Sequence, residues 1–98
     1  MDYPTDEELE KVKTWKPQEG ETWKPLFDYV KDLWNYADCG YWEEPREGVY
    51  HISCAGWSGN EELMDAMHRN RIFWLMCWWE SKRGGHYKFK LPHVKGNL

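Results

Sequence analysis

The sequence has few cysteines and no long apolar run. Cys39, Cys54 and Cys77 are an odd number, and no two of them have the Cys-x-x-Cys spacing of zinc sites. We therefore expect neither a disulfide scaffold nor a metal or other cofactor. No apolar stretch approaches the roughly 18 residues of a membrane-spanning helix, and no signal peptide is recognisable. These absences predict a reduced, soluble protein of the cytoplasm that does not bind membranes.

Acidic side chains are missing from the last part of the chain. From Ser81 onward the charged residues are all basic. Residues 1–47 hold 13 acidic and 6 basic residues (net −7), whereas residues 48–98 hold 4 acidic and 7 basic residues (net +3). The overall charge of −4 argues against binding to duplex nucleic acid. The basic end would suffice for one small anion, although a solvated charged tail is the commoner role of such a segment.

Aromatic residues are abundant for a chain of this size. The 98 residues are enough for one domain, with residues 1–20 as a helix and linker and residues 21–98 as its core. The sequence has 8 Trp, 6 Tyr and 3 Phe, and each ring buries on the order of 150–250 Å². Most rings fill the core, but we expect others in a pocket, on an exposed patch or in a contact between copies. A homodimer or higher oligomer is therefore predicted.

Two helices are expected in the first 40 residues. Thr5 and Glu8 have the spacing of a capping box and begin a short acidic helix that ends before Pro17. Thr22 is the expected N-cap of a second helix. Apolar residues recur at three- and four-residue steps over residues 23–38, which predicts an amphipathic helix.

Strand and helix patterns alternate in the rest of the chain. After a loop over residues 41–47, alternation predicts strands over 48–54 and 86–91, with a helix over 59–69 between them. The apolar run 72–79 is ambiguous, but its aromatic content and the glycines after it favour a strand over 72–80 in a hairpin. A strand-helix-strand unit usually forms a parallel pair. We therefore predict an α+β fold with two N-terminal helices, then β-α-β-β, and a three-stranded mixed sheet.

The segment Gly56–Glu61 has the pattern of a strand that turns directly into a helix. Ser58 and Glu61 have the spacing of a capping box. The helix would then begin with the backbone N–H groups of Gly59 and Asn60 free. Such a helix start attracts anions through these donors and the helix dipole.

A second tight turn, Lys82–His86, carries positive charge. The predicted parallel pair places both turns at the carboxyl edge of the sheet, where ligands bind in α/β proteins. Arg83 offers a donor fork for phosphate or carboxylate, although a simple hairpin turn with a solvated arginine explains it too. Trp57 either belongs to the core or stacks on a ligand ring. The candidate ligand-binding residues are Trp57, Ser58, Gly59, Asn60, Lys82, Arg83 and His86.

The same segment nearly matches the Gly-x-Ser-x-Gly nucleophile elbow of serine hydrolases. Asp65 and then His86 or His93 follow in the order that hydrolases use. Asn60 breaks the motif, however, and the chain is too short for a hydrolase sheet. An N-cap role explains Ser58 without catalysis. We therefore predict a protein without enzymatic activity.

Several segments resemble a group of small uncharacterised proteins encoded by bacteriophages and prophages. They are Gly56–Glu61, Phe73–Trp74, Cys77–Trp78 and Arg83–Tyr87. The resemblance implies a phage accessory protein that acts in the cytoplasm of the bacterial host, against host defence. It transfers no catalytic residue.

Two functions are compatible with these patterns. The first is capture of a small anionic, nucleotide-like ligand, such as a host signalling nucleotide. The alternative is an inhibitor that binds a host protein through an aromatic and acidic surface. A ligand pocket should hold its aromatic rings in a concave site beside Arg83. An interaction protein should show them on an open face or pair them across a homodimer.

Overall fold

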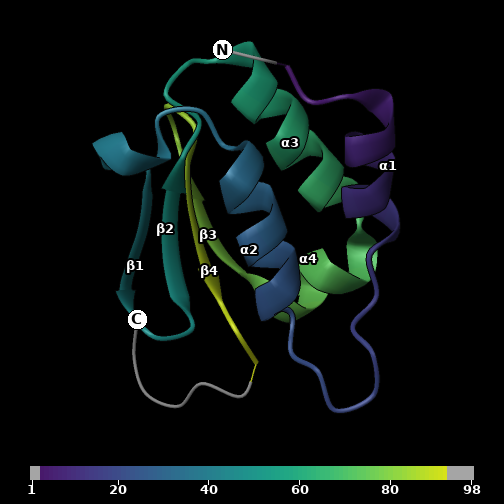
Figure 1. Cartoon of the computed structure of the whole chain (residues 1–98). Helices are drawn as coiled ribbons and strands as arrows, with labels where there is room; N and C mark the ends of the chain where they lie inside the picture. Colours follow the sequence, from purple (N-terminus) through teal and green to yellow (C-terminus); the bar gives the residue numbers. More distant parts are fainter. Residues whose placement is uncertain (1–2, 93–98) are drawn as a thin grey trace.

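The computed structural model describes residues 3–92 and has an α+β fold. Figure 1 shows its elements in chain order. These are α1 (Asp6–Thr14), α2 (Lys24–Leu33), the short 3-10 helix η1 (Ala37–Cys39), β1 (Trp42–Arg46), β2 (Val49–Ser53), α3 (Ser58–Arg69), α4 (Arg71–Cys77), β3 (Trp78–Lys82) and β4 (His86–Lys90). Within residues 3–92, none of the helices has the length and apolar content needed to cross a bilayer.

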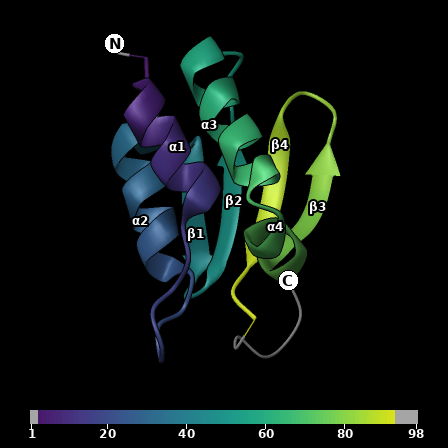
Figure 2. The ribbon, with the colours of Figure 1, turned by 90° about the vertical axis from the view of Figure 1, so that its right-hand side faces the viewer.

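The four strands form one antiparallel sheet in the order β1-β2-β4-β3. Helices α1 to α4 all lie on one face of this sheet (Figures 1 and 2). The predicted α+β class is confirmed, but the three-stranded mixed sheet is wrong. No parallel pair joins the strands that begin at residues 49 and 78, because β4 lies between them and pairs with both. The predicted hairpin that ends in residues 86–91 is confirmed as β3–β4.

The run 72–80, predicted as one strand, is mostly helical. It forms α4 and only then continues as β3. The Asn70 side chain starts the helix, since its Oδ1 accepts a hydrogen bond from the backbone N–H of Phe73 at 3.2 Å. Phe73 and Cys77, one turn apart, are the buried residues of the helix. In a strand Leu75 would share the face of these two residues, but it is 85% exposed, so the burial pattern fits a helix.

The predicted loop over residues 41–47 contains the edge strand β1. Trp42 is buried against the rings of Phe27 and Trp34, which fixes this segment on the sheet. Gly48 has a φ of 80° and lies in the turn between β1 and β2. A glycine adopts that positive φ without strain, so the tight connection is possible here.

The helix boundaries differ from those expected at several points. The capping box of Thr5 and Glu8 at the start of α1 is confirmed. The helix predicted over residues 23–38 ends at Leu33, because the indole of Trp34 turns inward and donates a hydrogen bond to the carbonyl of Ser53. The N-cap of α2 is Trp23 rather than the expected Thr22.

The core lies between the sheet and the helices and is built around Phe27 of α2. Its ring stacks on that of Tyr50 with centroids 3.9 Å apart and an interplanar angle of 8°. Phe73 and Phe89 meet Phe27 edge-on at 5.3 and 5.6 Å. Burial raises the pKa of Tyr50, so its phenol stays neutral. Much of the aromatic content is therefore explained by this cluster.

Candidate functional site

The two turns of the predicted site lie side by side. The backbone N–H of Cys54, at the end of β2, donates a hydrogen bond of 3.0 Å to the carbonyl of Gly85. Strands β2 and β3 run in the same direction on either side of β4, so their carboxyl ends share one edge of the sheet. The expected neighbourhood therefore exists, although β4 intervenes between the two strands.

The start of α3 is built differently from the predicted capping box. The N-cap is Trp57, which makes no side-chain cap, and Ser58 is exposed at the first helical position. The Glu61 backbone N–H donates to the Trp57 carbonyl at 3.0 Å, so the helix begins one residue earlier than expected. The Ser58–Glu61 capping box is therefore wrong, because Ser58 is already inside the helix.

The side chain of Trp57 covers this helix start. A Cβ placed on Gly59 would lie only 2.8 Å from Trp57 Nε1, so a larger residue would collide with the indole. The Trp57 ring also stacks on the ring of Tyr3, with centroids 5.4 Å apart. Trp57 Nε1 is buried and has no hydrogen-bond partner among the described residues. The indole thus lies between Gly59 and the N-terminal segment.

Asn60 is fully buried and its side chain is engaged within the protein. Its Oδ1 accepts a hydrogen bond from the backbone N–H of Asn35 at 2.8 Å. Its Nδ2 donates to the carbonyls of Asn35 at 3.0 Å and Cys54 at 3.3 Å. Asn60 therefore joins α3 to the segment after α2 and to the end of β2, which is a structural role.

The basic residues of the second turn face the uncovered side of the sheet or solvent. Lys82 and His86 line a hollow of about 380 Å³ there, together with His51 and Lys88. Lys82 forms an ion pair with Glu80 at 3.3 Å. Arg83, at the tip of the hairpin, is exposed and does not line this hollow. The structure thus brings Lys82 and His86 together but leaves the residues of the α3 start outside the hollow.

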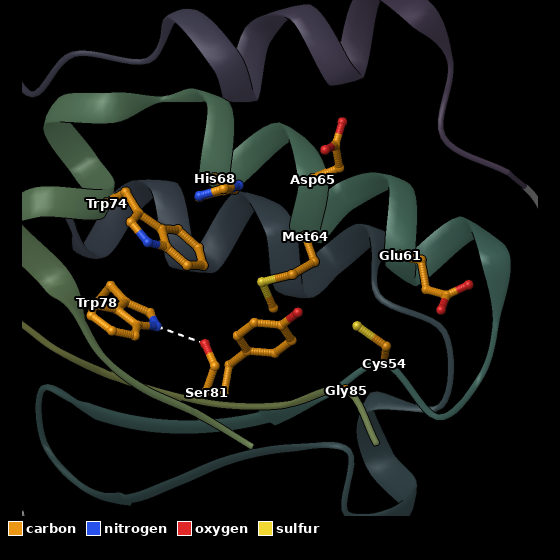
Figure 3. A pocket seen from close by; sticks show the side chains of 10 residues that line it. Cys54, Glu61, Met64, Asp65, His68, Trp74, Trp78, Ser81 and Gly85 are labelled. Atoms are coloured by element: carbon orange, nitrogen blue, oxygen red, sulfur yellow. Dashed lines mark hydrogen bonds between the residues drawn. The ribbon is translucent and has the colours of Figure 1, made fainter. Parts of the chain in front are cut away.

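A second hollow, the aromatic groove, lies between α3 and the β3–β4 hairpin (Figure 3). Its volume is about 440 Å³. The residues that line it are Cys54, Glu61, Met64, Asp65, His68, Trp74, Trp78, Ser81, Gly85 and Tyr87. None of the seven predicted ligand-binding residues is among them. The groove depends on the helix α4, because Trp74 points into it from that element, and the sequence prediction had placed Trp74 in a strand.

Three aromatic rings form the walls of the groove. The rings of Trp74 and Trp78 are nearly parallel, at 15° and 6.0 Å between centroids, and Tyr87 meets Trp74 at 73° and 6.2 Å. The indole N–H of Trp78 donates to Ser81 Oγ at 2.8 Å, as Figure 3 shows. This bond fixes the orientation of the Trp78 ring, which stacks on Trp74.

The charged groups at the groove are carboxylates. Asp65 forms an ion pair with Arg69 at 2.8 Å, and its side chain points away from the groove in Figure 3. Glu61 forms no ion pair with any residue between 3 and 92. Burial, reinforced by the Glu61 charge, raises the pKa of Cys54 to about 11, so this thiol is neutral. Burial and nearby negative charge also raise the pKa of Tyr87.

Most of the exposed large apolar side chains of the described residues lie on α4 and the start of β3, and we call this region the α4–β3 face. It consists of Ile72, Leu75, Met76, Trp78 and Trp79, and Leu75 is 85% exposed. The sequence analysis missed this face because it assigned the run to a strand. Periodicity gave no signal for it, because every residue from 72 to 79 is apolar.

The residues of the hydrolase alternative are not joined in one site. Ser58 and Asp65 line a shallow hollow between α1 and α3, whereas His86 lines the hollow on the sheet. His93 lies outside the described residues. Within the described range, no group of three His, Cys, Asp or Glu side chains is arranged to hold a metal ion.

Comparisons with known proteins found no match. No protein-family model, no curated protein and no solved structure matches it. Its resemblance to phage proteins therefore stays a prediction, and function has to be inferred from its own residues.

Proposed function

We propose that the protein is a non-enzymatic interaction module that binds protein surfaces through its α4–β3 face. In the absence of another partner, a second copy of the chain occupies this face. The observation that carries the proposal is the exposure of three large apolar side chains that are close in the sequence, Leu75, Met76 and Trp79. Contiguous apolar patches of this kind are uncommon on monomers and mark interaction sites. Tryptophan and methionine are also enriched in the buried core of protein–protein interfaces.

The strand β3 supplies a second reason for self-association. It is an edge strand, and no residue between 3 and 92 pairs with its outer side. Such an edge is a template for pairing with another chain. Two copies of β3 paired antiparallel about Ser81 would place Glu80 of each copy opposite Lys82 of the other. Opposite charges at that position support the pair.

Substitution of Leu75 by glutamate is expected to dissociate the dimer. The new charge would have to be buried in an apolar contact, which is strongly unfavourable. Sedimentation equilibrium should give twice the chain mass for the wild type and the chain mass for Leu75→Glu. Tyr36→Glu is the matched control, because Tyr36 is also exposed but lies outside the face, and it should stay dimeric. A wild-type protein that sediments as a monomer at every concentration would overturn the proposal.

The resemblance to phage proteins extends the proposal to a partner in the infected bacterium. A host protein with an apolar surface would compete with the second copy for the α4–β3 face. The module would then act as an inhibitor of that host protein.

Capture of a small anionic ligand is a second candidate function, and the hollow on the uncovered face of the sheet favours it. Lys82, His86 and Lys88 bring basic groups to this hollow, which Glu43 and Glu80 also line. Nε2 of His51, which also lines it, is buried and has no hydrogen-bond partner among the described residues. A buried polar atom without a partner calls for an explanation, and a bound ligand would supply one.

Phosphate-containing compounds test this second candidate. If the ligand lies in the hollow, Lys88→Gln should weaken binding by about tenfold or more, because a charge-assisted hydrogen bond contributes about 1.5–3 kcal/mol. Calorimetry with inorganic phosphate and a nucleotide panel measures the affinity, with Lys31→Gln as the charge-matched control. A loss on Arg83→Ala but not on Lys88→Gln would place the ligand at the hairpin tip instead. Absence of heat with every compound would exclude the anion function.

A further inference from the structure

The aromatic groove has the lining of a site for a positively charged organic group. Trp74 and Trp78 present nearly parallel rings, and Tyr87 stands at 73° to Trp74. The faces of aromatic rings carry negative partial charge, so rings that line one hollow attract a cation that enters it. The volume of about 440 Å³ is within the range of ligand sites and exceeds that of one cationic side-chain end.

The walls of the groove are held in place by contacts within the protein. Trp78 is fixed by its hydrogen bond to Ser81. Trp74 packs edge-on against the buried Phe89 at 5.5 Å, and His68 contacts it at 4.6 Å. A site whose rings are already positioned binds with a smaller loss of conformational freedom than a flexible one.

The charges at the groove select against anions. The ten residues that line it include Glu61 and Asp65 but no lysine or arginine. Arg69 neutralises Asp65, so Glu61 remains as the carboxylate available to an incoming cation. Figure 3 shows Glu61 at one end of the groove, beyond Cys54. The Cys54 thiol is neutral and does not oppose it.

Contacts between cations and ring faces already occur elsewhere in this protein. Lys11 Nζ lies 4.8 Å from the ring centroid of Tyr29, and Lys90 Nζ lies 5.1 Å from that of Trp79. Both involve exposed or half-buried rings of the same kinds that line the groove. The groove differs because its three rings have no lysine or arginine of the described chain over them.

We propose that the aromatic groove binds a guanidinium or alkylated ammonium group, with Trp74, Trp78 and Tyr87 contacting the cation and Glu61 balancing its charge. The group belongs either to a small free cation or to an arginine or methylated lysine side chain of a protein. This site goes beyond the proposed docking through the α4–β3 face. It shares Trp78 with that face but requires no second copy of the chain, so a test on monomeric protein separates the two proposals.

Nuclear magnetic resonance titration of the monomeric Leu75→Glu protein tests the site. The titrant is a capped trimethyllysine amide, and its control is the neutral isostere with carbon in place of the ammonium nitrogen. We expect the indole N–H signals of Trp74 and Trp78 to move with the cation and to stay unchanged with the isostere. Equal binding of both compounds, or unmoved signals, would overturn the proposal. Because the background is monomeric, failure of self-association leaves this result unaffected.

Two variants locate the cation. Glu61→Gln should weaken binding by about three- to fivefold, the effect of one partly exposed charge pair. Glu62→Gln removes the same charge from the neighbouring residue, which does not line the groove, and should bind like its parent. Trp74→Ala should lose about two- to thirtyfold, the contribution of one ring face to a cation. Equal affinities of the two glutamine variants would contradict the assignment of Glu61.

Two further titrants separate the sources of the cation. Tetramethylammonium presents the charge alone, and a capped tripeptide centred on trimethyllysine adds the backbone of a protein partner. Tighter binding of the tripeptide supports a protein side chain as the natural occupant. Equal binding supports a small free cation. Binding of neither titrant in the presence of intact Trp74 and Trp78 would exclude the site.

Discussion

Replacement of Asn60 by leucine is expected to lower the free energy of unfolding by about 3 kcal/mol, since each of its three hydrogen bonds contributes about 1 kcal/mol. Leucine has a similar size but leaves the backbone groups of Asn35 and the carbonyl of Cys54 without partners. Burying such groups without hydrogen bonds is costly. The effect should appear as a lower urea midpoint with an unchanged denaturant slope.

The matched control for this change is Asn35→Ala. The Asn35 side-chain nitrogen is buried without a hydrogen-bond partner among the described residues, so its removal loses no such bond. The unfolding free energy should then stay within about 0.5 kcal/mol of the wild type. Both variants need to be compared at one protein concentration, because self-association adds to apparent stability. Equal losses for the two variants would show that Asn60 does not join the segments as described.

Phe27→Ala is expected to cost about 3–5 kcal/mol, the usual range for removing a buried aromatic side chain. Phe27 is fully buried and touches rings from α4, β2 and β4, so its loss leaves a cavity that no single element can fill. At this size the loss approaches the total stability of many small domains. Thermal unfolding followed by circular dichroism measures it.

Phe27→Leu separates the loss of volume from the loss of the ring. Leucine retains much of the buried volume, and swaps of this kind usually cost less than about 1.5 kcal/mol. If the alanine and leucine variants melted at the same temperature, the cavity would not be the cause of the instability.

The first half of the chain was predicted most accurately where side chains cap the backbone locally. Thr5 and Glu8 bond to each other's backbone groups, and no distant contact is needed to set the start of α1. The end of α2 was missed because it depends on Trp34, whose indole bonds to Ser53 on the sheet. The strand β1 was missed for a similar reason, since its order depends on the packing of Trp42.

The run 72–80 shows why the site could not be predicted in full. Residues 72–79 are all apolar, so a buried strand and a helix with an exposed apolar face give the same pattern. The decisive contact comes from Asn70, which caps α4 and also donates to the carbonyls of Val12 and Trp15 in the N-terminal region. Without α4 there is neither an α4–β3 face nor a Trp74 wall in the aromatic groove.

Of the seven residues predicted to bind an anion, the structure places only Lys82 and His86 around one hollow. Lys82 and His86 do share a hollow, because alternation along β4 and the hairpin turn placed them correctly. Asn60 was expected to offer its backbone N–H at a helix start, but its side chain proved to be an internal link. No pattern in the sequence distinguishes an exposed helix start from one that is covered by Trp57.

The central claim is that the α4–β3 face is the interaction surface, and amide spectra recorded over a dilution series of the wild-type protein test it most directly. We predict that the signals of residues 71–82 shift with concentration, because α4 and β3 pass from a contact between copies into solvent. Signals of α1, α2 and β1 should stay in place. Concentration-dependent shifts confined to β1 and the region of Tyr36, or no shifts at all, would contradict the account.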